Sequence, residues 1–251
     1  MGLRVATWNL NTWINRREGR STDDCWRWAD ENLKADLLIL TEAPTKPPAY
    51  SGDRWSFAVR PGGFPNRGNW GTLIAGDKVE VRHLTHIGDD REIELDNRFP
   101  GSLTSADTYV NGRHFATVVG LYLPYRKNGN REFVGHPAKD LRELGSDLDA
   151  IGRHMDSPLI VAGDLNTEYS AIPSTLRGIT RRRHRLVDPF ISGHLTTFRQ
   201  DWPPHREFTM DYLYVSKSLA RRITRVEGGF QDVPDAADWS DHAPLVVEID
   251  F

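Results

Sequence analysis

Side chains that can bind a cation or transfer a proton stand at the ends of short apolar segments along this sequence. Oxygen donors of Asn, Asp and Glu suit a hard divalent cation such as Mg²⁺ or Mn²⁺. A histidine beside an aspartate can orient or protonate a reacting group. Because strand ends meet at one rim of packed sheets, separated segments could supply a single site. The residues concerned are Asn9, Glu42, Asp164, Asn166, Asp211, Asp241 and His242.

Each of these residues adjoins a segment with the composition of a β-strand. Short runs rich in Val, Ile, Leu and aromatic residues are typical of buried strands. Polar groups directly beside such runs are predicted to lie at the strand ends. The runs are Leu3–Trp8 before Asn9, Asp36–Leu40 before Glu42, Leu159–Ala162 before Gly163-Asp164-Leu165-Asn166, Asp211–Val215, and Leu245–Ile249 after Asp241-His242.

Taken singly, each of these groups also has a structural explanation. Glu42 could be a solvated strand end, and Gly163–Asn166 could form an Asx-turn. Asp211 and Asp241 could cap a turn or a loop, and His242 could be an ordinary surface or core histidine. The functional interpretation therefore rests on the combination and its order, rather than on any one residue.

The remaining elements indicate an α+β fold with two packed sheets and helices outside them. Asn111-Gly112, between Tyr109 and the arm His114–Leu123, is a strong hairpin signal. Absence of a repeat or linker predicts a single domain over residues 1–251. Other expected strands are Trp55–Val59, Thr72–Ala75, Val79–Leu84 and Ile223–Val226, and expected helices are Thr22–Leu33 and Pro137–Met155.

Composition is that of an ordinary globular protein and argues against non-specific coating of nucleic acid. The 251 residues are 38% hydrophobic and 27% charged, with a net charge of -3. Cys25 is the only cysteine, which excludes an internal disulfide and a thiolate metal cluster. No signal-peptide layout and no apolar run near the ~18 residues of a membrane helix are found. These features predict a monomeric cytoplasmic enzyme without membrane insertion.

Five blocks of the sequence, in this order, resemble the signature segments of the endonuclease/exonuclease/phosphatase superfamily, which includes abasic-site endonucleases and DNase I. The resemblance extends from near residue 3 to residue 249. Gly71–Ile74 and Tyr122–Pro124 resemble two further segments of that family. The five blocks are Thr7–Asn11, Leu38–Glu42, Gly163–Asn166, Thr209–Leu213 and Trp239–Pro244.

The resemblance implies a DNase I-like, four-layer α/β sandwich in which a metal binds at the rim. It implies that Glu42 is the principal metal ligand, with Asn9 and Asp241 close to the metal. The expected cofactor is Mg²⁺ or Mn²⁺, and the expected activity is hydrolysis of a phosphate ester.

The resemblance also assigns roles to the residues that would contact substrate. Asp164 would position or deprotonate the attacking water, and Asn166 would hold the phosphate and the nucleophile. His242 would bind a phosphate oxygen, with Asp211 fixing its tautomer and charge. Tyr122 would contact the phosphate.

Substrate class is less well specified by the sequence. Abasic-site endonucleases usually show Gln where this chain has Thr41, and Asn where it has Tyr125. Two basic segments beside site motifs could contact a phosphate backbone or could be solvated loops. They contain Arg126, Lys127 and Arg131, and Arg177, Arg181, Arg182, Arg183, His184 and Arg185.

Three interpretations remain open. The first is a nuclease that cleaves nucleic-acid phosphodiester bonds, in which Trp13, Trp70 and Trp202 could stack on bases, although most of the tryptophans are expected in the core. The alternative is a phosphatase or phosphodiesterase for a small molecule, a phosphoinositide or a phospholipid. A binding module without catalysis is the third, but such a protein is expected to lack residues of the Glu42, Asp164 and His242 type.

Overall fold

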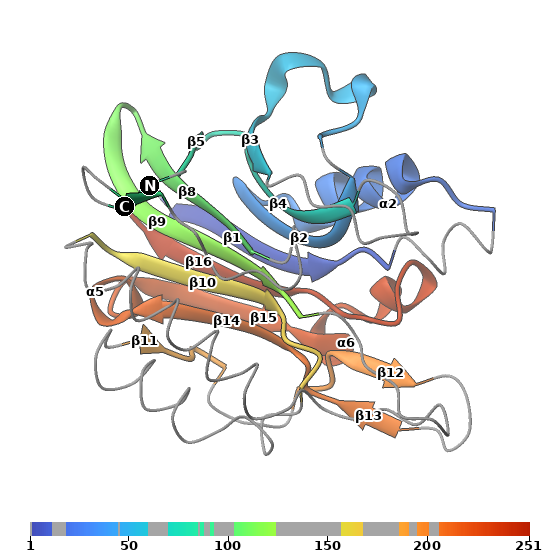
Figure 1. The fold of residues 1–251 in the computed structure, drawn as a ribbon. Coiled ribbons are helices and arrows are strands. Elements are labelled where there is room, and N and C mark those ends of the chain that lie inside the picture. The colour runs from blue at the N-terminus through green and yellow to red at the C-terminus, as the bar shows by residue number, and fades with distance from the viewer. Residues whose placement is uncertain are drawn as a thin grey trace.

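Two six-stranded sheets pack face to face to form the body of the molecule (Figure 1). The computed structural model describes residues 2–11, 19–44, 46–59, 70–84, 86–87, 91–92, 103–123, 157–167, 186–190, 195–200 and 206–251. The expected α+β sandwich of two sheets is confirmed, since apolar side chains of both sheets face one another across a shared core.

The first sheet joins strands from the two ends of the chain. Its central strand β1 pairs in parallel with β2 and antiparallel with β16. The sheet order is β15 (Ile223–Gly228), β16 (Leu245–Asp250), β1 (Gly2–Asn9), β2 (Leu37–Pro44), β4 (Trp70–Gly76) and β3 (Ser56–Val59).

The second sheet has a parallel pair at its centre, where β10 runs beside β9. The predicted hairpin is confirmed: Asn111 and Gly112 have φ of 51° and 74° and connect β8 to β9. The sheet order is β11 (Leu186–Val187), β14 (Asp211–Ser216), β10 (Leu159–Asp164), β9 (Arg113–Tyr122), β8 (Leu103–Val110) and β5 (Glu80–His83). Two-stranded ladders are formed by β12 (Phe198–Gln200) with β13 (Arg206–Phe208), and by β6 (His86–Ile87) with β7 (Arg91–Glu92).

Side chains that alternate in direction along β1 contact two separate layers of the core. Leu3 and Val5 face the second sheet, whereas Ala6 and Trp8 face the outer layer that contains helix α2 (Thr22–Trp28). Ser21 caps this helix with a capping box. The predicted single helix over 22–33 needs correction, because the turns after Trp28 widen into the π-helix η1 (Ala29–Leu33), which still buries its first and last residues.

The other described helical elements are short. They are η2 (Ala49–Arg54), α5 (Lys217–Ala220), α6 (Gly229–Asp232) and η5 (Pro234–Asp238). The predicted helix Pro137–Met155 lies outside the described residues. Among the residues that the structure describes, no helix has the length and apolar composition required to cross a membrane.

Gly120 sets how closely the two sheets approach beneath the rim that carries Tyr122. A Cβ at this position of β9 would lie 2.5 Å from Thr72 Cγ2 and 3.1 Å from Ile39 Cγ2, both on the opposite sheet. Interiors are close-packed, and an added methyl group there would force the sheets apart.

We therefore expect Gly120→Ala to lower the free energy of unfolding by about 1–3 kcal/mol, the usual cost of overpacking. Gly2→Ala is a matched control, because its Cβ would approach nothing closer than 3.9 Å. Urea unfolding measures both variants. Equal effects of the two substitutions would show that the sheets are not in tight contact at Gly120.

Candidate active site

Residues from both sheets meet at one end of the sandwich. Asn9 is the last residue of β1 and Asp164 is the last residue of β10. On the second sheet, Asp164 pairs in register with Asp211 on one side and with Tyr122 on the other. The expectation that Asn9, Glu42 and Asp164 follow their strands was wrong by a few residues: Asn9 and Asp164 are the last residues of their strands, and Glu42 lies within β2, at an irregularity in its pairing.

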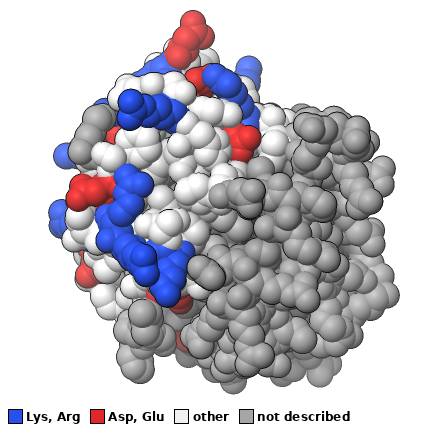
Figure 2. Space-filling view, turned by 90° about the vertical axis from the view of Figure 1, so that its left-hand side faces the viewer, with Lys and Arg blue, Asp and Glu red and all other residues white. Residues whose placement is uncertain are grey.

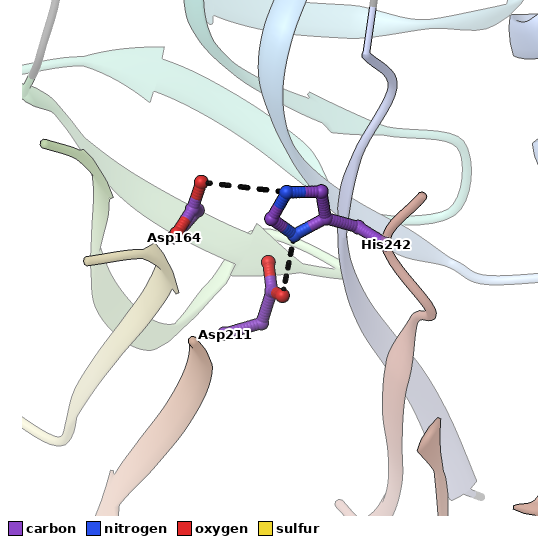
Figure 3. A group of neighbouring side chains, drawn as sticks. All are labelled: Asp164, Asp211 and His242. Carbon is purple, nitrogen blue, oxygen red and sulfur yellow. Dashed lines mark hydrogen bonds and ion pairs between the residues drawn. The ribbon is translucent and has the colours of Figure 1, made fainter. Parts of the chain in front are cut away.

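Asp164, Asp211 and His242 form a contiguous buried group (Figure 3). His242 Nδ1 lies 2.8 Å from Asp211 Oδ2, and His242 Nε2 lies 3.9 Å from Asp164 Oδ2. The side chain of Asp241 also approaches the ring, with Oδ1 3.8 Å from Nε2. One imidazole therefore connects two aspartates that project from neighbouring strands of the second sheet.

Burial and mutual attraction act in opposite directions on the charges of this group. Burial alone would lower the pKa of His242, but the charges of Asp211 and Asp164 outweigh it and raise the pKa to about 10. The pKa of Asp164 lies well above its ordinary value because the carboxyl is buried, although the His242 charge opposes that rise. At neutral pH the imidazole is therefore protonated on both nitrogens.

Asp164 is surrounded by hydrogen-bond donors. Its Oδ2 accepts from Asn9 Nδ2 at 2.9 Å and from Asn166 Nδ2 at 2.8 Å, and its Oδ1 accepts the backbone N–H of Asn166 at 2.6 Å. The bond from Asn9 crosses between the sheets. These donors fix the carboxyl in one orientation and satisfy a group that is completely buried.

The loop that carries His242 is hydrogen-bonded to β1. Trp8 Nε1 donates to the backbone carbonyl of His242 at 2.8 Å. Ser240 Oγ donates to the carbonyl of Asn9 at 2.8 Å and accepts the backbone N–H of His242 at 3.1 Å. Ser240 and Trp8 lie within the sequence blocks that suggested the family, but sequence reasoning gave neither of them a role.

A second connection runs through Thr197, which sequence reasoning missed entirely. Its buried Oγ1 accepts the backbone N–H groups of Met210 at 2.9 Å and Asp211 at 3.1 Å. Its carbonyl accepts the N–H of Ala243, next to the catalytic candidate His242, at 2.8 Å. Thr197 thereby joins the segment carrying Asp211 to the one carrying His242. A threonine in a short loop gave no local signal for this position.

Glu42 is placed by a β-bulge in β2. Pairing with β4 shifts between Leu40 and Ala43, so that Thr41 and Glu42 face only one residue, Thr72. Glu42 adopts the left-handed conformation with φ of 49°, which is uncommon outside glycine and costs about 1–2 kcal/mol. Its Oε1 accepts a hydrogen bond from the Tyr122 hydroxyl at 2.8 Å. The bulge thus directs the carboxylate toward the second sheet.

Asp241 is held from the first sheet by an asparagine. Asn11 Nδ2 donates to Asp241 Oδ1, while the Asn11 backbone N–H donates to Asn9 Oδ1 at 2.9 Å. The structure therefore brings Asn9, Asp241, His242 and Asp164 into one hydrogen-bonded and ion-paired network. Glu42 and Tyr122 adjoin it, since Tyr122 pairs in register with Asp164.

A sequence profile of the endonuclease/exonuclease/phosphatase family matches residues 6–242. The chain belongs to this family. The match spans Asn9, Glu42, Asp164, Asp211 and His242, and therefore includes strands of both sheets and the rim between them. Comparison with curated protein sequences finds no match.

Solved structures of the same architecture extend over nearly the whole chain. An abasic-site (AP) endonuclease from Leishmania major is similar with a TM-score of 0.73 and 17% identity, covering 100% of this chain and 88% of that one. The endonuclease domain of the telomere-specific retrotransposon TRAS1 has a TM-score of 0.67 and 16% identity, covering 99% of each chain. An AP endonuclease from Archaeoglobus fulgidus has a TM-score of 0.64 and 18% identity, covering 99% of this chain and 100% of that one. These similarities confirm the DNase I-like fold.

The basic segments predicted to face the site lie outside the described residues, including Arg126, Arg181, Arg182 and Arg183. Figure 2 shows the end of the sandwich that carries both chain termini, where Lys and Arg are interspersed with Asp and Glu. Gly2 and Asp250 pair at that end, whereas Asn9 lies at the opposite end of β1. Charges on the face in Figure 2 are therefore remote from the candidate site.

Replacing Asp211 by Asn tests the electrostatics of the metal-free protein. The variant keeps a hydrogen-bond acceptor but removes the charge that raises the pKa of His242, so we expect His242 to titrate well below its value of about 10 in the wild type. Stability contributed by a raised histidine pKa is present at low pH and lost as pH rises through the folded-state pKa. The loss of folding stability with rising pH should therefore occur at lower pH in the variant than in the wild type.

Side-chain ¹⁵N NMR of His242 in EDTA measures the titration, and urea unfolding as a function of pH measures its effect on stability. An unchanged His242 titration in Asp211→Asn would contradict the ion pair.

Proposed function

We propose that this member of the family is a divalent-metal-dependent phosphodiesterase that cleaves nucleic-acid phosphodiester bonds by in-line attack of an activated water. The observation that carries the proposal is the buried group of Asp211, His242 and Asp164 at the rim. It combines a cationic donor with an adjacent carboxyl group, and both can promote hydrolysis of a phosphodiester.

His242 is suited to stabilise negative charge on the phosphoryl oxygens. Its Nδ1 is engaged by Asp211 at 2.8 Å, and its Nε2, on the opposite side of the ring, lies 3.9 Å from Asp164 Oδ2 and 3.8 Å from Asp241 Oδ1. A preorganised cation in a buried site stabilises developing charge more strongly than one in water. Asp211 holds the ring and maintains its charge.

Asp164 is suited to orient the attacking water and to accept its proton. Asn9 and Asn166 fix its carboxyl from two sides, and the burial that raises its pKa makes it a stronger base than an exposed aspartate. Asn166 Nδ2 donates to Asp164 Oδ2 at 2.8 Å and to the carbonyl of Leu123 at 2.7 Å, so it holds Asp164 in place, and contact with a phosphate would require one of these bonds to break. The proposed pathway forms no covalent intermediate.

A divalent cation fits the oxygen donors of this rim. Glu42 and Asp241 are partly exposed carboxylates, and the Asn9 amide oxygen accepts the backbone N–H of Asn11, whose side chain donates to Asp241. Mg²⁺ and Mn²⁺ favour such oxygen ligands, and a bound cation would stabilise charge on the phosphate. Asp164, Asp211 and His242 also lie close enough to form a ligand group. We favour Glu42, Asn9 and Asp241, because Mg²⁺ and Mn²⁺ prefer oxygen ligands and this set contains no nitrogen donor.

Nucleic acid is the proposed substrate because structurally similar proteins are named as AP endonucleases and as a retrotransposon endonuclease. Small phosphodiesters, phosphoinositides and phospholipids share the reacting group, so they are the competing substrates in the test. Supercoiled plasmid, single-stranded DNA and RNA should be assayed beside soluble phosphoesters and phosphoinositide vesicles, each with Mg²⁺ and with Mn²⁺.

We expect nucleic acid to be cleaved in Mg²⁺ or Mn²⁺ and the activity to disappear in EDTA. Glu42→Gln removes a charge that a hard cation requires while keeping the side chain's size, so activity should collapse without unfolding. Glu80→Gln is the matched control, because Glu80 is an exposed carboxylate on β5. Full activity in EDTA would contradict the proposed dependence on a divalent cation. Preferential turnover of a small phosphoester would show that nucleic acid is not the preferred substrate.

The coupling of His242 and Asp211 tests the mechanism. His242→Ala should reduce kcat on the order of 10²-fold or more, the scale of losing one preorganised donor. Asp211→Asn should have a smaller effect, because the ring remains. Since the two residues act as a unit, the double variant should lose far less than the product of the single losses. Strictly multiplicative losses at full metal occupancy would contradict a functional pair.

A further inference from the structure

Tyr122 connects the second sheet to the proposed metal ligand on the first. Its ring is buried at the end of β9, with 2% exposure, and its hydroxyl donates to Glu42 Oε1 at 2.8 Å. Glu42 itself is only partly buried. The tyrosine is therefore the fixed member of the pair, and the more exposed carboxylate side chain, which has more rotatable bonds, is the member that needs holding.

The direction of this hydrogen bond constrains what Tyr122 can do. A phenol carries one proton, and an ionised carboxylate can only accept. While the proton is directed at Glu42, the hydroxyl cannot donate to a phosphate oxygen. Donation to phosphate, the role suggested by family resemblance, would require the bond to Glu42 to break.

The backbone conformation at Glu42 explains what the hydrogen bond from Tyr122 contributes. The bulge and the left-handed φ of 49° direct the side chain toward the second sheet, but a backbone conformation does not by itself fix the side-chain torsions. Tyr122 is positioned to restrict them, because its register partner Asp164 anchors that end of β9 at the centre of the site. Hydrogen bonds of this kind orient metal-ligating carboxylates and strengthen metal binding.

We propose that Tyr122 is a positioning residue that holds Glu42 in the orientation required to bind the divalent cation, and that it does not act as a phosphate ligand. This inference rests on the proposed function, since it assumes that Glu42 binds metal. Tyr122 acts through Glu42, so its removal should affect metal affinity before it affects the substrate.

The experiment measures binding of Mn²⁺ and Mg²⁺ by isothermal titration calorimetry to the wild type, Tyr122→Phe, Glu42→Gln and Tyr212→Phe, all freed of metal. Tyr122→Phe keeps the buried ring and removes one hydroxyl. Tyr212→Phe is the matched control, because its buried hydroxyl donates to the carbonyls of Thr167 and Thr209 instead of to a carboxylate. Thermal unfolding of each variant establishes that it is folded.

We expect Tyr122→Phe to raise the metal Kd by roughly 10- to 100-fold, the usual effect of removing a group that orients a metal ligand. Tyr212→Phe should leave the Kd unchanged, and Glu42→Gln should bind more weakly than either. At saturating metal, KM of Tyr122→Phe for bis(4-nitrophenyl) phosphate should equal that of the wild type.

An unchanged metal Kd in Tyr122→Phe, with weaker binding in Glu42→Gln, would overturn the inference and leave the proposed function standing. A raised KM at saturating metal together with that unchanged Kd would identify Tyr122 as a phosphate contact. If the wild type binds neither cation and retains hydrolysis in EDTA, the proposed metal site fails, and the inference fails with it.

Discussion

The structure depends on the burial of ionisable groups between two apolar sheets. Asp164, Asp211 and His242 are each at most 4% exposed, and isolated charges in such surroundings would be strongly destabilising. Compensation comes from contacts that join one sheet to the other: Asn9 to Asp164, and His242 to Asp211. A buried pair of this kind contributes little stability, but removing one partner leaves an unpaired charge. The group therefore fixes the relative position of the two sheets at the rim.

Several backbone segments hold that group in place. The loop before β16 is fastened to β1 through Ser240 and Trp8, and Thr197 joins it to the start of β14. Trp8 in turn packs on Trp28 of helix α2, with ring centroids 4.8 Å apart. The outer layer of the first sheet thus supports the position of His242 through Trp8. The hydrogen bond from Trp8 Nε1 to the backbone carbonyl of His242 connects these packed tryptophans to the loop that carries the imidazole.

Three of the five non-glycine residues with positive φ in the described part of the chain lie at the same rim. Glu42, Asn166 and Asn11 all have positive φ, between 42° and 49°. Asparagine tolerates this region, whereas glutamate there is unusual and persists only where surrounding contacts impose it. At Glu42 the bulge against Thr72 and the hydrogen bond from Tyr122 provide those contacts. A side chain that would otherwise follow the alternation of β2 is thereby directed into the site.

The sequence alone predicted most strands of the two six-stranded sheets, the hairpin and the identity of the polar groups near the strand ends. These features depend on local chemistry: alternation has a period of two, and Asn111-Gly112 favours the turn that it forms. The sequence also indicated which residues belong together, because their order matched a family. Tertiary structure decided the bulge at Glu42, the direction of the Tyr122 hydrogen bond and the part played by Thr197. Each of these depends on which strand lies beside which and how closely the sheets approach, and no local pattern encodes that distance.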